Sequence, residues 1–494
     1  MRLRVKILKF IAGRPIAILD EETAIRVNVH VNERIIILND HKKIIAVVDT
    51  SKGSLLKKDE IAISNEVINA LGLKEDDFVE VSIAEKPESL HIIKKKMDGG
   101  ILKPEEIERI IKDIVNNALT EAEISYFVAA VYKNGMNDKE TESLISSMVS
   151  TGKQLHFKGQ VVDKHSIGGI AANRTTMIVV PICAAAGLTM PKTSSRAITS
   201  AAGTADVVEA IAKVEFTAEQ IEHMVKKIGA CMVWGGSLGL SPADDKLIQI
   251  ERILSLDPKA QLLASVLSKK ISVGSKYIII DIPFGKSAKV SQVEGLQLKK
   301  DFEKFGKKFG LKLKCVLTKG DEPIGRGVGP LLEVRDVIKV LKREEDCPKD
   351  LEAKSLFLAG EIFELCGKAE KGEGEKLASA ILDSGRAFNK FKEIIEAQSG
   401  KIPSEKEIQS RLGLFRKDFV AEKDSKITEI SNKKINLIGS IAGSPMDKGA
   451  GLYLYHHVGD EVKKGEPLFT IYSESPARLK NAFELSEKVQ PIVY

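Results

Sequence analysis

The stretch from residue 163 to residue 209 reads DKHSIGGIAANRTTMIVVPICAAAGLTMPKTSSRAITSAAGTADVVE, and it decides the fold. Two turns with glycine and hydroxyl side chains, 164–169 and 194–204, flank an apolar run. A glycine turn that opens a helix exposes backbone N–H groups, and the helix dipole adds positive charge at the same place. The sequence therefore predicts an anion site of the phosphate type at each turn.

The first turn lies between a short strand predicted over 160–162 and an apolar helix predicted over 177–186. A strand, a glycine turn and a helix begin an α/β unit, in which ligands lie at the carboxyl ends of strands. Lys164 and Ser166 stand directly before the glycines, and Thr175 follows them. Phosphate needs donors that converge from several directions, so these side chains favour an anion site over a purely structural turn.

The second turn, 194–204, contains five hydroxyl side chains and one arginine within eleven residues. This number of donors exceeds what an ordinary helix start requires and favours an anionic ligand. In the structural alternative, Thr204 caps the following helix and Arg196 pairs with a carboxylate such as Asp206. His165 of the first turn either orients a partner or bonds to the backbone, and the sequence leaves both roles open.

Composition limits the class of protein. A chain of 494 residues is too long for one core and predicts roughly three or four domains. No apolar run reaches the ~20 residues that span a bilayer, so no membrane segment is expected. The balance of 75 basic against 69 acidic residues, with 5% aromatics, suits anionic small molecules and disfavours a nucleic-acid surface. Five scattered cysteines without a C-x-x-C pair predict a reducing cytoplasm and neither zinc nor disulfides.

The amino-terminal region, residues 1–84, alternates strand-like runs with polar turns and predicts a small β-rich module for packing or assembly. The strands are predicted over 3–11, 35–38, 44–48 and 79–83, and a short helix over 65–71 ends at Gly72.

A helical unit follows. Isoleucines at helical spacing follow Pro104, which suits the first position of a helix. Two further helices start at Thr120 and Asn137, each with a glutamate three residues later, which is the spacing of a capping box. A helix beginning at Pro242 returns the chain to this unit until about Lys270.

The remaining chain contains a central strand and a second β-rich region. The strand is predicted over 277–282, and Lys286 and Lys289 on the next loop are either substrate contacts or surface lysines. The region 425–494 resembles biotinyl and lipoyl domains and places Lys448 near the expected hairpin tip, so a carrier protein is one alternative.

Several ordered motifs now carry a family resemblance. Lys164-His-Ser-x-Gly-Gly, then Ser-x-Arg, then Gly-Thr-x-Asp-x-x-Glu209 resembles the thymidine/pyrimidine nucleoside phosphorylase family, with similarity over residues 96–494. The implied fold is a multidomain α/β protein, with a helical domain across a cleft from a mixed α/β domain and small β-rich domains at both ends. The implied boundaries are 1–84 (assembly domain), 85–158 with 237–272 (helical, base side), 159–236 with 273–424 (α/β, phosphate-binding) and 425–494 (barrel-sandwich-like domain).

The resemblance assigns phosphate contacts to Lys164, Ser166 and Thr175. On the base side, Ser265 matches a family serine, but Ile250 stands where pyrimidine enzymes have an arginine. An aliphatic side chain cannot donate hydrogen bonds to a pyrimidine carbonyl, which indicates a different base. Asp257 is then the expected proton donor to a purine leaving group, with the alternative that it caps a helix starting at Pro258.

The additional hydroxyls of the second turn, together with the extra amino-terminal module, are similar to the archaeal-type AMP phosphorylase branch of the family. This similarity implies that AMP and phosphate give adenine and ribose 1,5-bisphosphate, with CMP and UMP as further substrates. The implied AMP contacts are Gly169, Ser194, Ser195, Arg196, Ala197, Ile198, Thr199, Ser200, Thr204, Ser265 and Lys289.

The same resemblance implies a cytoplasmic pentosyltransferase that needs inorganic phosphate as co-substrate and no metal or organic cofactor. It also implies a homodimer formed through the helical domain, with larger assembly through the amino-terminal domain. The alternative enzyme is a plain pyrimidine or thymidine nucleoside phosphorylase.

Overall fold

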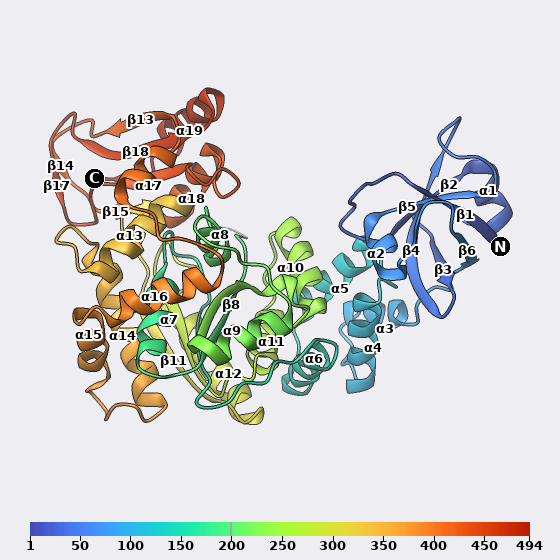
Figure 1. Cartoon of the computed structure of the whole chain (residues 1–494), viewed down its shortest axis with the longest axis horizontal. Helices are drawn as coiled ribbons and strands as arrows, with labels where there is room; N and C mark the ends of the chain where they lie inside the picture. The colour runs from blue at the N-terminus through green and yellow to red at the C-terminus, as the bar shows by residue number, and fades with distance from the viewer. Residues whose placement is uncertain (198–199) are drawn as a thin grey trace. The chain divides into compact units, whose positions relative to one another are not determined.

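The computed structural model describes residues 1–197 and 200–494, and these divide into two compact units (Figure 1). The first unit comprises Met1–Gly152 and Ser241–Ser268, and the second comprises Lys153–Leu240 and Lys269–Tyr494. The finer division into four domains, with its boundaries, stays a prediction.

A closed barrel of strands in the order β1-β5-β2-β4-β3-β6 begins the first unit. Alternating apolar residues such as Leu3 and Val5 point into its core, which is fully buried. The predicted helix is present as α2 (Asn65–Leu71), and Gly72 ends it at φ +70°. Strands β2 and β5 were not predicted, and β5 is a run of only four residues, all buried. The barrel elements are β1 (Arg2–Ile7), β2 (Ile16–Asp20), α1 (Glu21–Val27), β3 (Arg34–Asn39), β4 (Lys42–Ser51), β5 (Glu60–Ile63) and β6 (Phe78–Ile83).

A helical bundle completes the first unit. The isoleucine face of α4, including Ile107 and Ile111, is completely buried, and Pro104 occupies its first position as predicted. The predicted capping boxes of Thr120 with Glu123 and of Asn137 with Glu140 are both formed. The bundle helices are α3 (Ser89–Met97), α4 (Pro104–Val115), α5 (Glu121–Asn134), α6 (Asp138–Ser150), α10 (Pro242–Leu254) and α11 (Lys259–Ser272), the last of which continues into the second unit.

Parallel strands form the centre of the second unit. The order is β11-β10-β7 in one sheet and β8-β9 in another, and a parallel bridge between Val161 and Thr189 joins β7 to β8. The carboxyl ends of these strands therefore lie along one edge, where ligands bind in such sheets. The strands are β7 (Val162–Ser166), β8 (Met190–Ser194), β9 (Ala230–Trp234), β10 (Tyr277–Phe284) and β11 (Lys312–Lys319).

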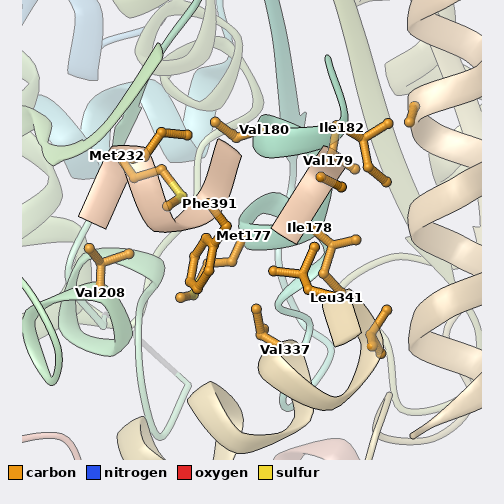
Figure 2. Packing of buried hydrophobic residues seen from close by; sticks show 14 of the residues in the cluster. Met177, Ile178, Val179, Val180, Ile182, Val208, Met232, Val337, Leu341 and Phe391 are labelled. Atoms are coloured by element: carbon orange, nitrogen blue, oxygen red, sulfur yellow. The ribbon is translucent and has the colours of Figure 1, made fainter. Parts of the chain in front are cut away.

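Helix α7 (Thr175–Ala185) occupies the centre of this unit. Its residues from Thr175 to Ala184 are all buried, which is typical of a helix that is apolar all round. Figure 2 shows its apolar side chains packed among Phe391, Val337 and Met232. Because α7 is enclosed, its first residue, Thr175, is held in a fixed place behind the first turn.

Further helices surround this core. They are α8 (Thr204–Glu209), α9 (Ala218–Ile228), α12 (Gln292–Lys308), α13 (Pro330–Lys342), α14 (Lys349–Leu365), α15 (Gly374–Asp383), α16 (Arg386–Ala397) and α17 (Glu405–Arg411).

Two sequence predictions about the turns were wrong. The strand predicted over 160–162 is β7 at Val162–Ser166, so the strand itself contains Lys164 and Ser166. Thr204 does not cap α8, because the capping residue is Gly203 and Thr204 is the first helical residue. Asp206 completes the cap by accepting a hydrogen bond of 2.9 Å from the Gly203 N–H.

The carboxyl-terminal region forms a four-stranded sheet of β12 (Gly327–Val328), β16 (Gly451–Leu454), β18 (Pro467–Ser473) and β13 (Phe415–Val420), with α18 (Asn432–Ala442) and α19 (Pro476–Val489) beside it. Lys448 lies outside these strands and helices, and its Nζ donates to Glu209 at 2.7 Å. A lysine held this way is not presented as the attachment point of a carrier domain, which disfavours the carrier alternative.

No helix in the described part of the chain combines the length and apolarity that a membrane crossing needs. Within the same residues, no group of three or more His, Cys, Asp or Glu side chains is arranged to hold a metal ion.

Candidate active site

A chain of hydrogen bonds joins the predicted phosphate residues of the first turn. The Lys164 Nζ donates to Thr175 Oγ1 at 2.7 Å, and Thr175 Oγ1 donates to Asn173 Oδ1 at 3.0 Å. Ser166 Oγ accepts from Asn173 Nδ2 and from the Gly168 N–H, both at 3.5 Å. The structure therefore brings Lys164, Ser166 and Thr175 together, with Asn173 as a link that the sequence reasoning missed.

The backbone of this turn requires glycine at two positions. Gly168 and Gly169 have φ values of +89° and +93°, a region that side chains rarely adopt. A Cβ atom at Gly169 would lie 2.7 Å from the backbone N of Lys289. The loop after β10 thus comes against the first turn at Lys289. The other candidate, Lys286, forms an ion pair with Glu429 and is 78% exposed, so Lys289 is the lysine beside the turn.

Burial controls the charge of the two titratable residues that follow Asp163. It lowers the pKa of Lys164 to about 8, the nearby Lys354 and Arg174 act in the same direction, and Asp281 opposes them. It also lowers the pKa of His165 well below its usual value, and the surrounding lysines add to this effect. His165 is therefore a neutral imidazole at pH 7, whereas Lys164 is mostly charged.

More buried lysines than aspartates lie next to the first turn. Asp163 pairs with Lys270 at 2.6 Å and with Lys192 at 3.4 Å. Asp281 pairs with Lys354 at 3.1 Å, beside Lys164. Burial lowers the pKa of Lys192 to about 7, and the neighbouring Lys270 acts in the same direction. A bound anion would favour the charged form of these lysines, which is the electrostatic character that a phosphate site needs.

The second turn starts at the carboxyl end of β8. Ser194 is the last residue of that strand, and its buried Oγ has no hydrogen-bond partner among the described residues. Ser195 is exposed, and Ser200 Oγ donates to the Ala202 carbonyl at 2.9 Å. The Ala197 N–H donates to Asp206 at 2.7 Å. The predicted contacts Ile198 and Thr199 lie outside the described residues.

Arg196 forms the carboxylate pairs that the structural alternative expected. Its guanidinium lies 3.2 Å from Asp206, 2.7 Å from Glu209 and 3.1 Å from Glu215. It also lies over the Trp234 ring, 4.6 Å from the ring centre. The structural role is therefore present, and contact with a nucleotide phosphate stays a prediction.

We expect Arg196→Ala to raise the KM for AMP about tenfold or more, with a much smaller change for adenosine. The variant removes a cation and leaves the carboxylates of Asp206 and Glu209 unbalanced beside the turn, which repels a nucleotide phosphate. Steady-state kinetics with both substrates measures this ratio. Glu215→Gln is the matched control, because it removes one partner of the network and keeps the guanidinium. Equal losses for AMP and adenosine would refute a phosphate contact.

Arg174 is the functional candidate that sequence reasoning missed. It lies between Asn173 and Thr175 of the first turn, and its guanidinium reaches the second turn. Nη1 donates to Thr204 Oγ1 at 2.8 Å and Nη2 donates to the Ala202 carbonyl at 2.7 Å. An arginine next to a predicted phosphate ligand was the available signal, but its partners are distant in sequence.

The base-side candidates all belong to the first unit. Ile250 on α10 is buried in the helical core, with 4% of its surface exposed, and so offers no polar contact. Asp257 is exposed, two residues before the first residue of α11. Ser265 is half-buried on α11, and its backbone carbonyl accepts from Ser268 Oγ at 3.4 Å. The helix predicted to start at Pro258 begins one residue later, at Lys259, so Asp257 is not the residue directly before α11 and its predicted capping role was wrong. The role of proton donor stays a prediction.

Three regions of the chain match known protein families. Residues 158–388 match the a/b domain of a glycosyl transferase family, and residues 90–152 match the helical bundle domain of that family. Residues 426–493 match the pyrimidine nucleoside phosphorylase C-terminal domain.

Full-length relatives decide the family. AMP phosphorylases from Thermococcus kodakarensis and Pyrococcus horikoshii are 44% and 45% identical to the chain over 494 residues, which is 100% of the chain and 97% of each relative. The AMP phosphorylase of Methanocaldococcus jannaschii is 43% identical over 461 residues, 93% of the chain and 91% of the relative. The chain belongs to the AMP phosphorylase family. The family resemblance drawn from the sequence motifs is therefore confirmed.

The fold class is confirmed by the same matches and by a solved structure. Anthranilate phosphoribosyltransferase from Thermus thermophilus aligns with a TM-score of 0.52 at 19% identity, over 62% of this chain and 99% of that chain. Identity at this level supports the fold alone. Within the family, the extra amino-terminal barrel lies outside residues 90–493, where the three domain matches fall.

Proposed function

We propose that this chain is a pentosyltransferase that phosphorolyses AMP to adenine and ribose 1,5-bisphosphate, with CMP and UMP as further substrates. The hydrogen-bonded set of Lys164, Thr175, Asn173 and Ser166 is the observation that carries the proposal. It presents a buried ammonium and hydroxyls at the carboxyl end of a parallel strand, which suits a phosphate dianion. The full-length similarity to AMP phosphorylases supports AMP as the nucleotide.

In the proposed reaction, a phosphate oxygen held by Lys164, Ser166 and Thr175 forms a bond to C1′ as the bond from C1′ to the base breaks. The electron pair of that bond goes to adenine, and Asp257 gives a proton to the base as it leaves. The hydroxyl-rich second turn and Lys289 bind the nucleotide. The proposed AMP contacts are Gly169, Ser194 to Ser200, Thr204, Ser265 and Lys289.

The proposal includes no metal or organic cofactor, and inorganic phosphate is a co-substrate. Assay of the enzyme after exhaustive treatment with a chelator tests this point. Loss of activity that returns with one divalent cation would contradict it.

The assay that decides between AMP and its alternative measures phosphate-dependent release of base from AMP, adenosine, CMP and thymidine. We expect AMP to be turned over faster than adenosine and thymidine. A pyrimidine nucleoside phosphorylase is the alternative, favoured by the match of residues 426–493 and opposed by the buried Ile250. Faster turnover of thymidine than of AMP would establish that alternative.

Assembly and location belong to the same proposal. We expect a homodimer through the helical domain and larger assemblies through residues 1–84, which contain a closed barrel with its own core. Sedimentation of the full chain and of a chain lacking residues 1–84 gives the number of subunits in each particle. The same number of subunits for both chains would contradict larger assembly through residues 1–84. All five cysteines are free thiols, which supports a reducing cytoplasm.

A further inference from the structure

Arg174 joins the two turns. It precedes α7 and lies between Asn173 and Thr175, two members of the hydrogen-bonded set of the first turn. Its guanidinium is buried, with only 7% of the side chain exposed. Each of its three nitrogens bonds to a different group: Nε to the Glu333 carboxylate, Nη1 to Thr204 Oγ1 at 2.8 Å and Nη2 to the Ala202 carbonyl at 2.7 Å.

Glu333 anchors this guanidinium from the far side. Its carboxylate is 1% exposed, and its second oxygen accepts from the Gly329 N–H at 2.9 Å at the start of α13. The anchor is therefore part of the buried core and not a mobile surface partner. A lysine could reach one of these acceptors, but only the planar guanidinium bonds to all three in fixed directions.

The chemistry of the Thr204 contact fixes the direction of that hydroxyl. A guanidinium has donors and no acceptor, so Thr204 Oγ1 accepts the bond from Arg174. The hydroxyl keeps its own hydrogen for another acceptor. Thr204 belongs to the predicted nucleotide contacts, and an anionic oxygen is the acceptor that would take this hydrogen most strongly.

We propose that Arg174 is a positioning residue that holds the two turns at one spacing and makes the Thr204 hydroxyl a donor to a ligand phosphate. The inference deepens the proposed function and rests on it for the identity of the ligand. Arg174 also lies within electrostatic reach of Lys164, so its charge adds to the field at the first turn. Its effect on the ligand is exerted through the Thr204 hydroxyl, which the spacing of the two turns places.

The test compares Arg174→Lys with Arg335→Lys. Arg335 is a matched control, because it is also a buried arginine of the second unit, but its guanidinium lies over Tyr453, 4.3 Å from the ring centre, and near Glu405 at 3.7 Å. Calorimetric titration of the full chain with inorganic phosphate, and with AMP, gives the affinities, and thermal unfolding gives the Tm. We expect Arg174→Lys to lose about tenfold in affinity for inorganic phosphate, for AMP or for both ligands. A loss of this size corresponds to one charge-assisted hydrogen bond. Arg335→Lys should keep the affinities for phosphate and AMP of the unaltered enzyme, although its Tm falls about as much as that of Arg174→Lys.

A double-variant comparison shows whether Arg174 acts through Thr204. Thr204→Val removes the hydroxyl, and adding Arg174→Lys to it should change the affinity by no more than about twofold. If the loss of affinity in the double variant equals the product of the two single losses, Arg174 does not act through Thr204 and the positioning role is overturned. The role is also overturned if Arg174→Lys keeps its affinity and loses as much Tm as Arg335→Lys. Phosphate titration needs no turnover, so a failure of the proposed AMP activity in the unaltered enzyme is recognised separately.

Discussion

Asp257→Asn is expected to slow release of adenine from AMP by a hundredfold or more, roughly the contribution of a positioned general acid, while the affinity for AMP changes little. The amide has nearly the shape of the acid but cannot supply the proton that the departing purine needs. Single-turnover assays of adenine formation measure the chemical step, and titration with AMP measures binding. A loss confined to turnover identifies a group that acts on the reacting atoms.

A structural role of Asp257 other than capping provides the control for this experiment. A carboxylate near the start of a helix stabilises that helix by interaction with its dipole, and Asp257 lies two residues before the first residue of α11. Asp138 is also exposed and occupies the first position of α6 in the same unit, so Asp138→Asn removes a comparable helix contribution. Unchanged turnover in Asp257→Asn, with a Tm loss like that of Asp138→Asn, would leave Asp257 with the structural role only.

Lys164→Met is expected to raise the KM for phosphate roughly a hundredfold or more, because loss of a buried charged partner costs several kcal/mol. Methionine keeps the apolar stem and removes the ammonium that bonds to Thr175. Steady-state kinetics with phosphate as the varied substrate measures the effect. A KM within a few-fold of the unaltered enzyme would show that Lys164 does not bind the attacking phosphate.

The pH dependence of the same step follows from the pKa of Lys164. Since this pKa is lowered to about 8, the ammonium loses its proton as pH rises through about 8, and kcat/KM for phosphate should fall above that pH. Lys192, whose pKa is about 7, is the second buried lysine that titrates nearby. The fall above pH 8 should persist in Lys192→Met and be absent in Lys164→Met. A profile of the unaltered enzyme that is flat to pH 9 would contradict the assignment.

Local patterns predicted the helix starts well. Thr120 and Asn137 form capping boxes with glutamates three residues away, so all the groups involved are neighbours in the chain. Pro104 similarly marks the first position of α4 because its ring fits only there. The predicted strand before the first turn was displaced, because β7 includes polar residues such as Lys164 that apolar patterning does not recognise as strand.

The partner of Arg196 could not be predicted from its neighbours in the sequence. The sequence offered either a nucleotide phosphate or a neighbouring carboxylate as its partner. The structure forms the carboxylate contacts, including Glu215 nineteen residues away, and stacks the guanidinium on Trp234. Which of these groups yields to a ligand depends on binding energies that residue types alone do not fix.

The sequence by itself identified the family, predicted Lys164, Ser166 and Thr175 as phosphate contacts, and indicated a different base through Ile250. These features depend on residue identity and short spacings, which the chain carries directly. Only the tertiary structure decided that Lys289 and not Lys286 lies against Gly169, and that Lys270 pairs with Asp163 across 107 residues.

Tertiary structure alone also joined Arg174 to Glu333, 159 residues away, and to Thr204. A guanidinium has many carboxylates and hydroxyls within reach in a chain of this composition. Its partners are fixed only when packed helices and strands hold particular acceptors at hydrogen-bond distance in the buried core, where an unpaired charge is costly. Packing, and not spacing, therefore links the two predicted phosphate turns through Arg174.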